Sequence, residues 1–288
     1  MAVALGLFAA LAFAAGTVLQ QRGTLRTPAG DARFLVQILH EPVWLAGGGL
    51  QALGWTFQAA ALDRGSLVVV QSLTTLSLVF ALPLGAWLTD QHIGRTEIVG
   101  ALAVVAGIVV FLSAGTPSGG TSDPSATAWW TAIVVSAVLV VGTGVLATKQ
   151  GGATRAALFG VAAGVSFGLQ AGVTKVFVNQ IGHGVAHLLA TWSTYGLIAS
   201  ALAGFVLQQS ALKTGVLAAA MGANNATTLL WSVVLGFLVF DETMAADAVR
   251  RAPAWLGLAL AVLGVITLAS RSSNVARVGN GRDSGRRP

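Results

Sequence analysis

Two pairs of polar residues stand inside otherwise apolar stretches of the sequence, at matching positions. Thr74 and Thr75 lie in one stretch and Asn224 and Asn225 in another, at a separation of 224 − 74 = 150. Hydroxyl and amide groups in an apolar environment need hydrogen-bond partners, which either a neighbouring helix or a bound polar solute supplies. Both pairs are therefore candidates for solute recognition, with structural hydrogen bonding as the alternative.

Other polar and aromatic residues can complete such a site. Gln51, Trp55 and Gln58 follow the spacing i, i+4, i+7, which places them on one face of a helix. Apolar walls with a few polar groups are typical of small-molecule pockets. We predict a substrate-binding set made up of Thr74, Thr75, Asn224, Asn225, Gln51, Trp55, Gln58, Gln71 and Lys175.

Charged residues at the ends of two apolar stretches have two interpretations each. Lys175 is the one cation inside a predicted span, three residues from its end. It either extends its amine to the membrane surface, or pairs with an anionic substrate, or holds a gate. Asp241 and Glu242 follow another apolar stretch and are interpreted as a solvated helix end or as partners in a gating ion pair.

The sequence contains none of the usual sets of catalytic residues. It has no cysteine, no Ser-His-Asp arrangement and no Gly-rich phosphate loop ending in Lys-Ser or Lys-Thr. His183 and His187, at i and i+4, can share a metal ion on one helical face, and the identity of any metal stays unknown. We predict a protein that is not an enzyme and uses no cofactor.

Composition indicates which elements position these residues. Hydrophobic residues make up 55% of the chain and charged residues 9%, with a mean hydropathy of +0.78. A soluble domain has about 25% charged residues. Unbroken apolar runs favour helices over barrel strands. Nine stretches are long enough to cross a bilayer: 1–19, 43–62, 66–88, 97–114, 128–147, 156–178, 185–207, 215–239 and 253–270.

An internal repeat organises these stretches. The segment from Leu53 to Leu67 recurs in weaker form from Ala203 to Leu217, again 150 positions later. In the first and sixth stretches, Gly6 answers to Gly160 at an offset of 154, and in the fourth and ninth, Gly100 answers to Gly257. The predicted fold is an all-α polytopic membrane protein of about nine transmembrane helices, in two inverted four-helix repeats joined by a central helix.

The repeats give the predicted boundaries. Residues 1–115 form the first repeat, 116–150 a linker and the central helix, 151–271 the second repeat, and 272–288 a disordered basic tail. A row of small residues in the sixth stretch is predicted to pack closely against another helix. Its members are spaced four residues apart: Gly160, Gly164, Gly168 and Gly172.

The distribution of basic residues predicts orientation. With the N-terminus outside, twelve of the sixteen Lys and Arg residues fall on the cytoplasmic side. This distribution predicts a multi-pass protein of the plasma (inner) membrane, with its C-terminus in the cytoplasm. The basic residues are spread over loops and the tail, so we expect membrane lipid and no nucleic acid as a partner. A homodimer is left open.

Several short segments carry a family resemblance. The chain resembles the drug/metabolite transporter (EamA-like) superfamily, and within it the NIPA-type magnesium-transporter branch, over roughly residues 1–272. The segments are Leu19-Gln20-Gln21-Arg22-Gly23, Trp44 to Gly54, Gly172-Val173-Thr174-Lys175 and Phe240-Asp241-Glu242. The branch has a Gly-Glu-x-x-Asn element, and Leu53 and Thr56 stand here at its Glu and Asn positions. Magnesium would therefore lack the carboxylate it usually binds.

These observations predict a secondary transporter of a small metabolite that works by alternating access. The resemblance implies a magnesium or other divalent-cation transporter as one alternative. A membrane scaffold or receptor subunit that transports nothing is the other, and in that case the polar pairs only pack.

Overall fold

The computed structural model describes residues 1–26, 40–89, 93–121, 124–212, 214, 216–244 and 247–283. Helices dominate this part of the chain, and two short strands pair with each other. The elements are α1 (Ala2–Arg26), α3 (Pro42–Arg64), α4 (Leu67–Thr74), α5 (Ser77–Thr89), α6 (Arg95–Gly115), β1 (Pro117–Gly119), α7 (Ala126–Thr148), α8 (Gly152–Gln180), the 3-10 turn η1 (Ile181–His183), α9 (Val185–Ala190), α10 (Trp192–Leu212), α11 (Leu217–Leu238), β2 (Glu242–Met244) and α12 (Ala248–Asp283).

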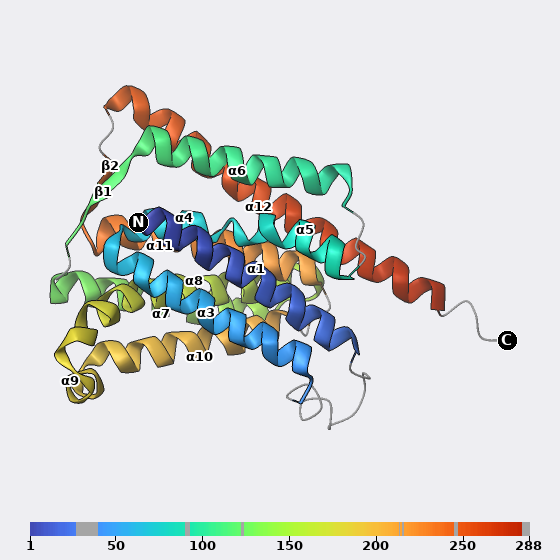
Figure 1. Cartoon of the computed structure of the whole chain (residues 1–288), viewed down its shortest axis with the longest axis horizontal. Coiled ribbons are helices and arrows are strands. Elements are labelled where there is room, and N and C mark those ends of the chain that lie inside the picture. Colours follow the sequence, from blue (N-terminus) through green and yellow to red (C-terminus); the bar gives the residue numbers. More distant parts are fainter. Residues whose placement is uncertain are drawn as a thin grey trace.

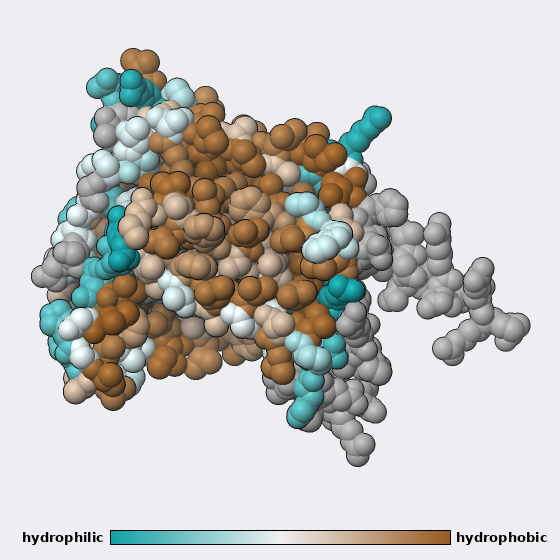
Figure 2. Space-filling view, in the orientation of Figure 1, coloured by the Kyte–Doolittle hydropathy of each residue, from teal (hydrophilic) through white to brown (hydrophobic). Residues whose placement is uncertain are grey.

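The outer surface of the helices is apolar, as in a protein that lies in lipid. Within the described residues, six helical segments are long and apolar enough to cross a membrane. They are Ala2–Gly23, Leu67–Leu88, Arg95–Gly115, Ala126–Thr148, Gly152–His183 and Val249–Thr267. Figure 2 shows apolar residues over the middle of one face and polar residues at the two ends of the helices. The chain is therefore a multi-pass helical membrane protein.

The strands mark one end of the molecule. β1 follows α6 and β2 follows α11, and they pair antiparallel, with Ser118 opposite Thr243. Figure 1 shows this small sheet at the same end of the helices as the N-terminus. We call this end, with Ala2, the Gly65-Ser66 turn, β1 and β2, the sheet end. The other end holds the starts of α6, α8 and α11.

The helices pair in the same way in the two halves of the chain. α1 packs against α3 and α5, and α8 packs against α10 and α11. The fourth helices of the two halves, α6 and α12, pack against each other, and α7 lies against α8. The largest buried cluster joins α3 and α4 of the first half to α8 and α11 of the second, around Leu67, Val173 and Leu235.

One close contact recurs at the offsets seen in the sequence. A Cβ atom on Gly54 would lie 2.6 Å from the ring of Phe13, and one on Gly204 would lie 2.7 Å from the ring of Phe167. Gly204 lies 150 residues after Gly54, and Phe167 lies 154 residues after Phe13. The same ring therefore packs on the same glycine in α1–α3 and in α8–α10.

The crossing of α6 and α12 is also symmetrical. A Cβ atom on Gly257 would lie 2.7 Å from the carbonyl oxygen of Gly107, and one on Gly264 would lie 2.8 Å from that of Gly100. From Gly257 to Gly264 the residue number rises along α12, while that of the contacted glycine falls from Gly107 to Gly100 along α6. The two helices are therefore antiparallel. Exchanging each residue for its counterpart in the other repeat converts one contact into the other.

One predicted helix, 66–88, is broken in the structure. α4 ends at Thr74 and α5 begins at Ser77, because Leu76 N–H donates to Leu73 O and Leu78 N–H to Thr75 O, in 3-10 fashion. The hydroxyl groups of Thr74 and Thr75 both donate to the carbonyl oxygen of Gln71, which competes with regular helical bonding. Hydropathy does not register such a break, since every residue around it is compatible with a membrane span.

Two other boundaries differ from the sequence prediction. The seventh stretch was expected over 185–207, but η1 and the short α9 occupy its beginning and α10 runs from Trp192 to Leu212. The predicted disordered tail, 272–288, is wrong up to Asp283, because α12 continues as helix to that residue. Extending an existing helix avoids the cost of nucleation. Arg33, Lys213, Ser122, Asp123 and 284–288, used in the orientation and linker predictions, lie outside the described residues.

Candidate functional site

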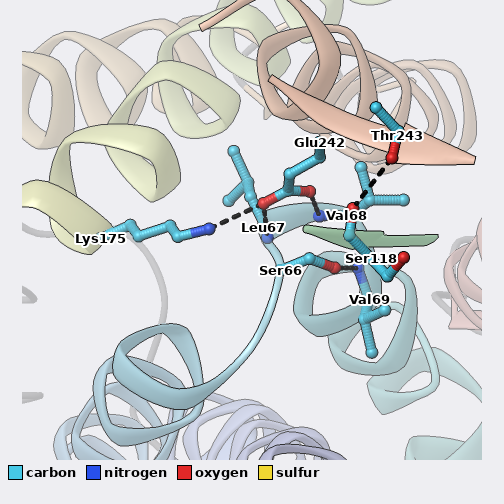
Figure 3. A network of polar contacts seen from close by, with 8 residues as sticks. All are labelled: Ser66, Leu67, Val68, Val69, Ser118, Lys175, Glu242 and Thr243. Carbon is cyan, nitrogen blue, oxygen red and sulfur yellow. Dashed lines mark hydrogen bonds and ion pairs between the residues drawn. The ribbon is translucent and has the colours of Figure 1, made fainter. Parts of the chain in front are cut away.

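Glu242 is the most completely enclosed charged residue at the sheet end. Its side chain is 0% exposed. A position three residues after the predicted helix end at 239 would ordinarily be exposed to solvent. Figure 3 shows its carboxylate directed at the first turn of α4. Oε1 accepts a hydrogen bond from Leu67 N–H and Oε2 accepts one from Val68 N–H, at 2.9 Å. A carboxylate from the second half of the chain thus caps a helix of the first half.

Lys175 completes this arrangement from α8. Its Nζ atom donates to Oε1 of Glu242 at 2.7 Å, and its side chain is 9% exposed. The same ammonium group lies 4.6 Å from the ring centroid of Phe240. Of the interpretations open for Lys175, extension to the membrane surface is therefore wrong in this conformation, and so is a solvated helix end for Glu242. The two form a buried ion pair.

Local sequence explains how these groups are placed. α4 begins at Leu67 because Ser66 is its N-cap residue, and the Ser66 hydroxyl accepts from Val69 N–H at 3.1 Å. This leaves the amides of Leu67 and Val68 for Glu242. On the other side, Asp241 has a positive φ of 52°, which turns the chain after α11 into β2. β2 pairs with β1, so Glu242 is held at a fixed position.

A cavity of about 460 Å³ lies at the sheet end, beside the ion pair. It is formed between the two halves, since its walls come from the α3–α4 turn, the β1 segment and α8. Lys175 lines it, together with the polar residues Asp63, Arg64, Ser66, Ser118 and Asn179. Asp63 and Arg64 form an ion pair of 3.1 Å whose side chains are 38% and 45% exposed.

Gln71 lies further along α4, on the far side of the Glu242 cap. It follows Leu67 by four residues, or about 6 Å along the helix axis. Its side-chain Oε1 accepts from the Thr74 hydroxyl at 3.1 Å, whereas its Nε2 is buried without a hydrogen-bond partner. A buried donor without a partner costs about 1–3 kcal/mol, so this amide is a candidate donor to a ligand.

The two polar pairs of the sequence analysis lie at different depths. The backbone of α4 runs against α11 in the opposite direction, with Val68 close to Gly236 and Leu76 in one cluster with Ala226. Thr74 is then level with about residue 230, roughly 9 Å from the level of Asn224. Each pair bonds within its own helix: Thr75 to Gln71, Asn225 Nδ2 to Met221 O, and Asn224 O to the Thr228 hydroxyl.

The polar face of α3, with Gln51, Trp55 and Gln58, was expected to line a substrate cavity. In the structure these residues do not line the cavity at the sheet end. Gln51 Nε2 donates to the Thr17 hydroxyl at 3.0 Å, which ties α3 to α1. Trp55 is 39% exposed on the outer surface, and Gln58 is half-buried. In the second half, Gln208 answers to Gln58 and approaches the sulfur of Met221 at 3.9 Å.

The small-residue row of α8 lies against α11. Cβ atoms on Gly160, Gly164 and Gly168 would fall within about 3 Å of α11, whereas one on Gly172 would have its nearest neighbour at 3.5 Å. In the described residues, no group of three or more His, Asp or Glu side chains is placed to hold a metal. The rings of His183 and His187 are 5.0 Å apart and exposed.

These features define the class as an all-α multi-pass membrane protein in which a buried carboxylate of the second half, paired with Lys175, accepts hydrogen bonds from α4 of the first half. Over 280 residues, 96% of its length, the chain is 33% identical to an uncharacterized protein of Corynebacterium glutamicum, of which it also covers 96%. The chain belongs to the same family as that protein. No family model matches the chain, and no solved structure matches it.

Proposed function

We propose that the protein is a secondary transporter of a small polar metabolite and works by alternating access between two inverted halves. The observation that carries this proposal is the buried Glu242 carboxylate. It joins the first turn of α4 to Lys175 of α8 at one end of the molecule. Hydrogen bonds between the halves to a carboxylate that Lys175 neutralises, confined to one end, are the type of contact that closes one side of a transport path.

The paired contacts of the two halves support the inverted repeat. The glycine–phenylalanine contact occurs once in each half, and the α6–α12 crossing maps onto itself when the repeats are exchanged. We propose that nine helical segments cross the membrane, α4 and α5 counting as one. Inverted repeats of this kind can exchange their conformations, which yields one state open to each side of the membrane.

The broken helix and the unpartnered amide support a solute path behind the gate. Discontinuous membrane helices often form substrate sites, since they expose backbone groups at mid-membrane. Here the break at Thr75 and Leu76 adjoins Gln71, whose Nε2 is buried without a partner. We propose Gln71 and Thr74 as substrate contacts near the sheet end, and Asn224 and Asn225 as their counterparts near the other end.

Membership of the drug/metabolite transporter superfamily remains part of this proposal. Its magnesium-transporting branch is the weaker alternative, because the described residues hold no cluster of three carboxylate or imidazole groups. Magnesium entry into proteoliposomes, followed by an internal dye, tests that alternative directly. A membrane scaffold with this fold is the second alternative, and it predicts no change of access at either end.

The chain has no cysteine, so single cysteines report access without further changes. Ser72 is 0% exposed and lies one turn behind the Glu242 cap, and Ala220 is 1% exposed near the other end of α11. We expect Glu242→Gln to open the sheet end. Labelling of S72C by a membrane-impermeant maleimide should then rise, while labelling of A220C should fall.

The opposite signs of these two changes distinguish transport from damage. A variant that merely unfolds raises the labelling of both cysteines. If the protein is a scaffold, the labelling rates of S72C and A220C should both stay low, and Glu242→Gln should not change them in opposite directions. Either of those results would contradict alternating access. Ser118→Cys, which is exposed at the sheet end in this structure, is the control for reagent and protein quality.

A further inference from the structure

Lys175 stands between two environments, and only one of its hydrogen-bonding positions is used. A lysine ammonium group has three donors. One donates to Oε1 of Glu242, and the ring of Phe240 covers another part of the group. Lys175 also lines the cavity of about 460 Å³ at the sheet end. The Lys175 side chain therefore borders this cavity and bonds to the gate carboxylate.

The other walls of the cavity suit a polar anion. The amide of Asn179 lies one turn of α8 after Lys175, and the Ser66 and Ser118 hydroxyls lie on the facing segments. Arg64, at the rim, adds a second positive charge, which its exposed ion pair with Asp63 offsets. Among the described residues that line the cavity, Asp63 is the one acidic residue. The volume is in the range of pockets for metabolite-sized ligands.

We propose that this cavity binds a small solute that carries a carboxylate group, and that this carboxylate takes Lys175 from Glu242. The inference rests on the proposed transport function and gives it a substrate class. The incoming group has the same chemistry as the one it replaces, so the exchange costs little electrostatic energy at Lys175. Glu242 is then left as a buried charge with only two backbone N–H partners, which destabilises the closed arrangement around it.

The consequence is a gate that its own substrate opens. While the cavity is empty, the ion pair ties α8 to the first turn of α4. When a carboxylate occupies Lys175, α8 is released from this link, and the Glu242 carboxylate that joins β2 to α4 loses its neutralising charge. The solute then stands beside the path to Gln71 and Thr74. A divalent cation is disfavoured at the described part of this site, since Asp63 is the one acidic residue there and already pairs with Arg64.

The test uses the full chain carrying S72C in proteoliposomes, with sodium acetate, sodium succinate and sodium gluconate as probes. Sodium chloride of equal ionic strength and the uncharged succinamide are the controls. We expect at least one carboxylate to raise the S72C labelling rate about fivefold or more, in the range of ordinary ligand coupling. Succinamide should leave the rate unchanged. Binding is measured in parallel as the shift of the thermal unfolding midpoint.

Two variants show whether Lys175 is the binding group. Lys175→Met should abolish the carboxylate-dependent midpoint shift, and Lys175→Arg should retain part of it. Asn179→Ala keeps the Lys175–Glu242 pair, so the fold is not at risk, and it should reduce the midpoint shift and the labelling response together.

The outcomes separate this inference from the proposed function. One outcome is that Glu242→Gln raises S72C labelling while no carboxylate raises it in the chain that retains Glu242. The proposed transport function is then kept, and the proposed carboxylate site is overturned. If carboxylates shift the midpoint of Lys175→Met as much as that of the parent, Lys175 is not the binding group. If they bind through Lys175 without changing S72C access, the exchange with Glu242 is wrong.

Discussion

Glu242 and Lys175 give each other the partner that a buried charge requires. Replacing Glu242 by Gln leaves the ammonium group of Lys175 buried with no opposite charge, and Lys175→Met leaves the carboxylate with only the α4 amides. We expect each single change to lower the free energy of unfolding by about 3–5 kcal/mol. The double variant should cost clearly less than the sum, because it leaves neither charge unpaired.

The measurement is thermal or denaturant unfolding of the four proteins of this cycle in one detergent. Additive costs would show that the two side chains act independently, against the contact described here. The exposed pair Asp63–Arg64 serves as the matched control, since Asp63→Asn should change stability by no more than about 1 kcal/mol.

Gln71 and Gln51 are expected to respond to the same substitution with opposite signs. Gln71→Met removes a buried donor that has no partner, so it should raise stability by about 1 kcal/mol. Gln51→Met removes the hydrogen bond to Thr17 and should lower stability by about the same amount. Unfolding midpoints of the two variants check this. A lower midpoint for Gln71→Met would mean that its amide has a partner in the folded protein.

The sequence predicted Lys175 as a site residue from its type and position. Its pairing with Glu242 depends on the burial of both side chains in the folded protein. Lys175 was selected because a cation inside an apolar span needs an explanation. Glu242 was interpreted as a solvated helix end or as a partner in a gating ion pair, because its position after α11 gives no sign of the partners it meets. Those partners, Leu67 and Lys175, lie 175 and 67 residues away. No local pattern of residues contains such separations.

At the scale of elements, hydropathy located the helices and missed what interrupts them. The ranges 97–114, 128–147 and 156–178 lie inside α6, α7 and α8. The break between α4 and α5 depends on the hydroxyl groups of Thr74 and Thr75, whose bonding choice is set by the folded surroundings. The antiparallel strands β1 and β2, three residues each, are too short to give a periodic signal.

The α6–α12 crossing should be intolerant of side chains. We expect Gly107→Leu and Gly257→Leu each to abolish or strongly reduce folded protein, because backbone atoms of the partner helix occupy the space of the new side chain. Overpacking of a core typically costs about 1–3 kcal/mol, and backbone cannot yield as a side chain does. The readout is the yield of monodisperse protein in size-exclusion chromatography.

Gly144→Leu in α7 is the matched control for this prediction. It is also a glycine in an apolar helix, but no atom lies within 4 Å of the position of its Cβ. Its yield should equal that of the parent chain. Equal losses for Gly107→Leu and Gly144→Leu would show that leucine in a membrane helix, rather than the crossing, causes the effect.

At the scale of the whole molecule, the internal repeat of the sequence corresponds to equivalent contacts in the two halves of the structure. The offsets of 150 and 154 residues, read from the sequence, connect Phe13–Gly54 with Phe167–Gly204, which the structure places in equivalent contacts. The correspondence found in the sequence therefore matches a pair of equivalent contacts in the structure. It could not predict the Lys175–Glu242 pair, because the pair does not follow the repeat: at the offset of 154, Lys175 corresponds to the uncharged Gln21.

Orientation in the membrane is a property of the whole molecule and follows from its two ends. Arg22, Arg26, Arg95, Lys149 and Arg155 lie at the end away from the sheet, where α1 and α7 end and α6 and α8 begin. Arg64, Arg250 and Arg251 lie at the sheet end. Since cytoplasmic loops carry the excess of Lys and Arg, the sheet end should face outside. The proposed carboxylate cavity would then be an extracytoplasmic entrance.

Single cysteines in the cysteine-free chain test this orientation in intact cells. Ser118→Cys in β1 should react with an impermeant maleimide from outside, and Thr148→Cys, exposed at the end of α7, should react only after permeabilisation. The two positions are exposed and lie at opposite ends, so each is the control for the other. The reverse pattern would put the cavity in the cytoplasm, and Glu242 and Lys175 would then close the path against cytoplasmic solutes.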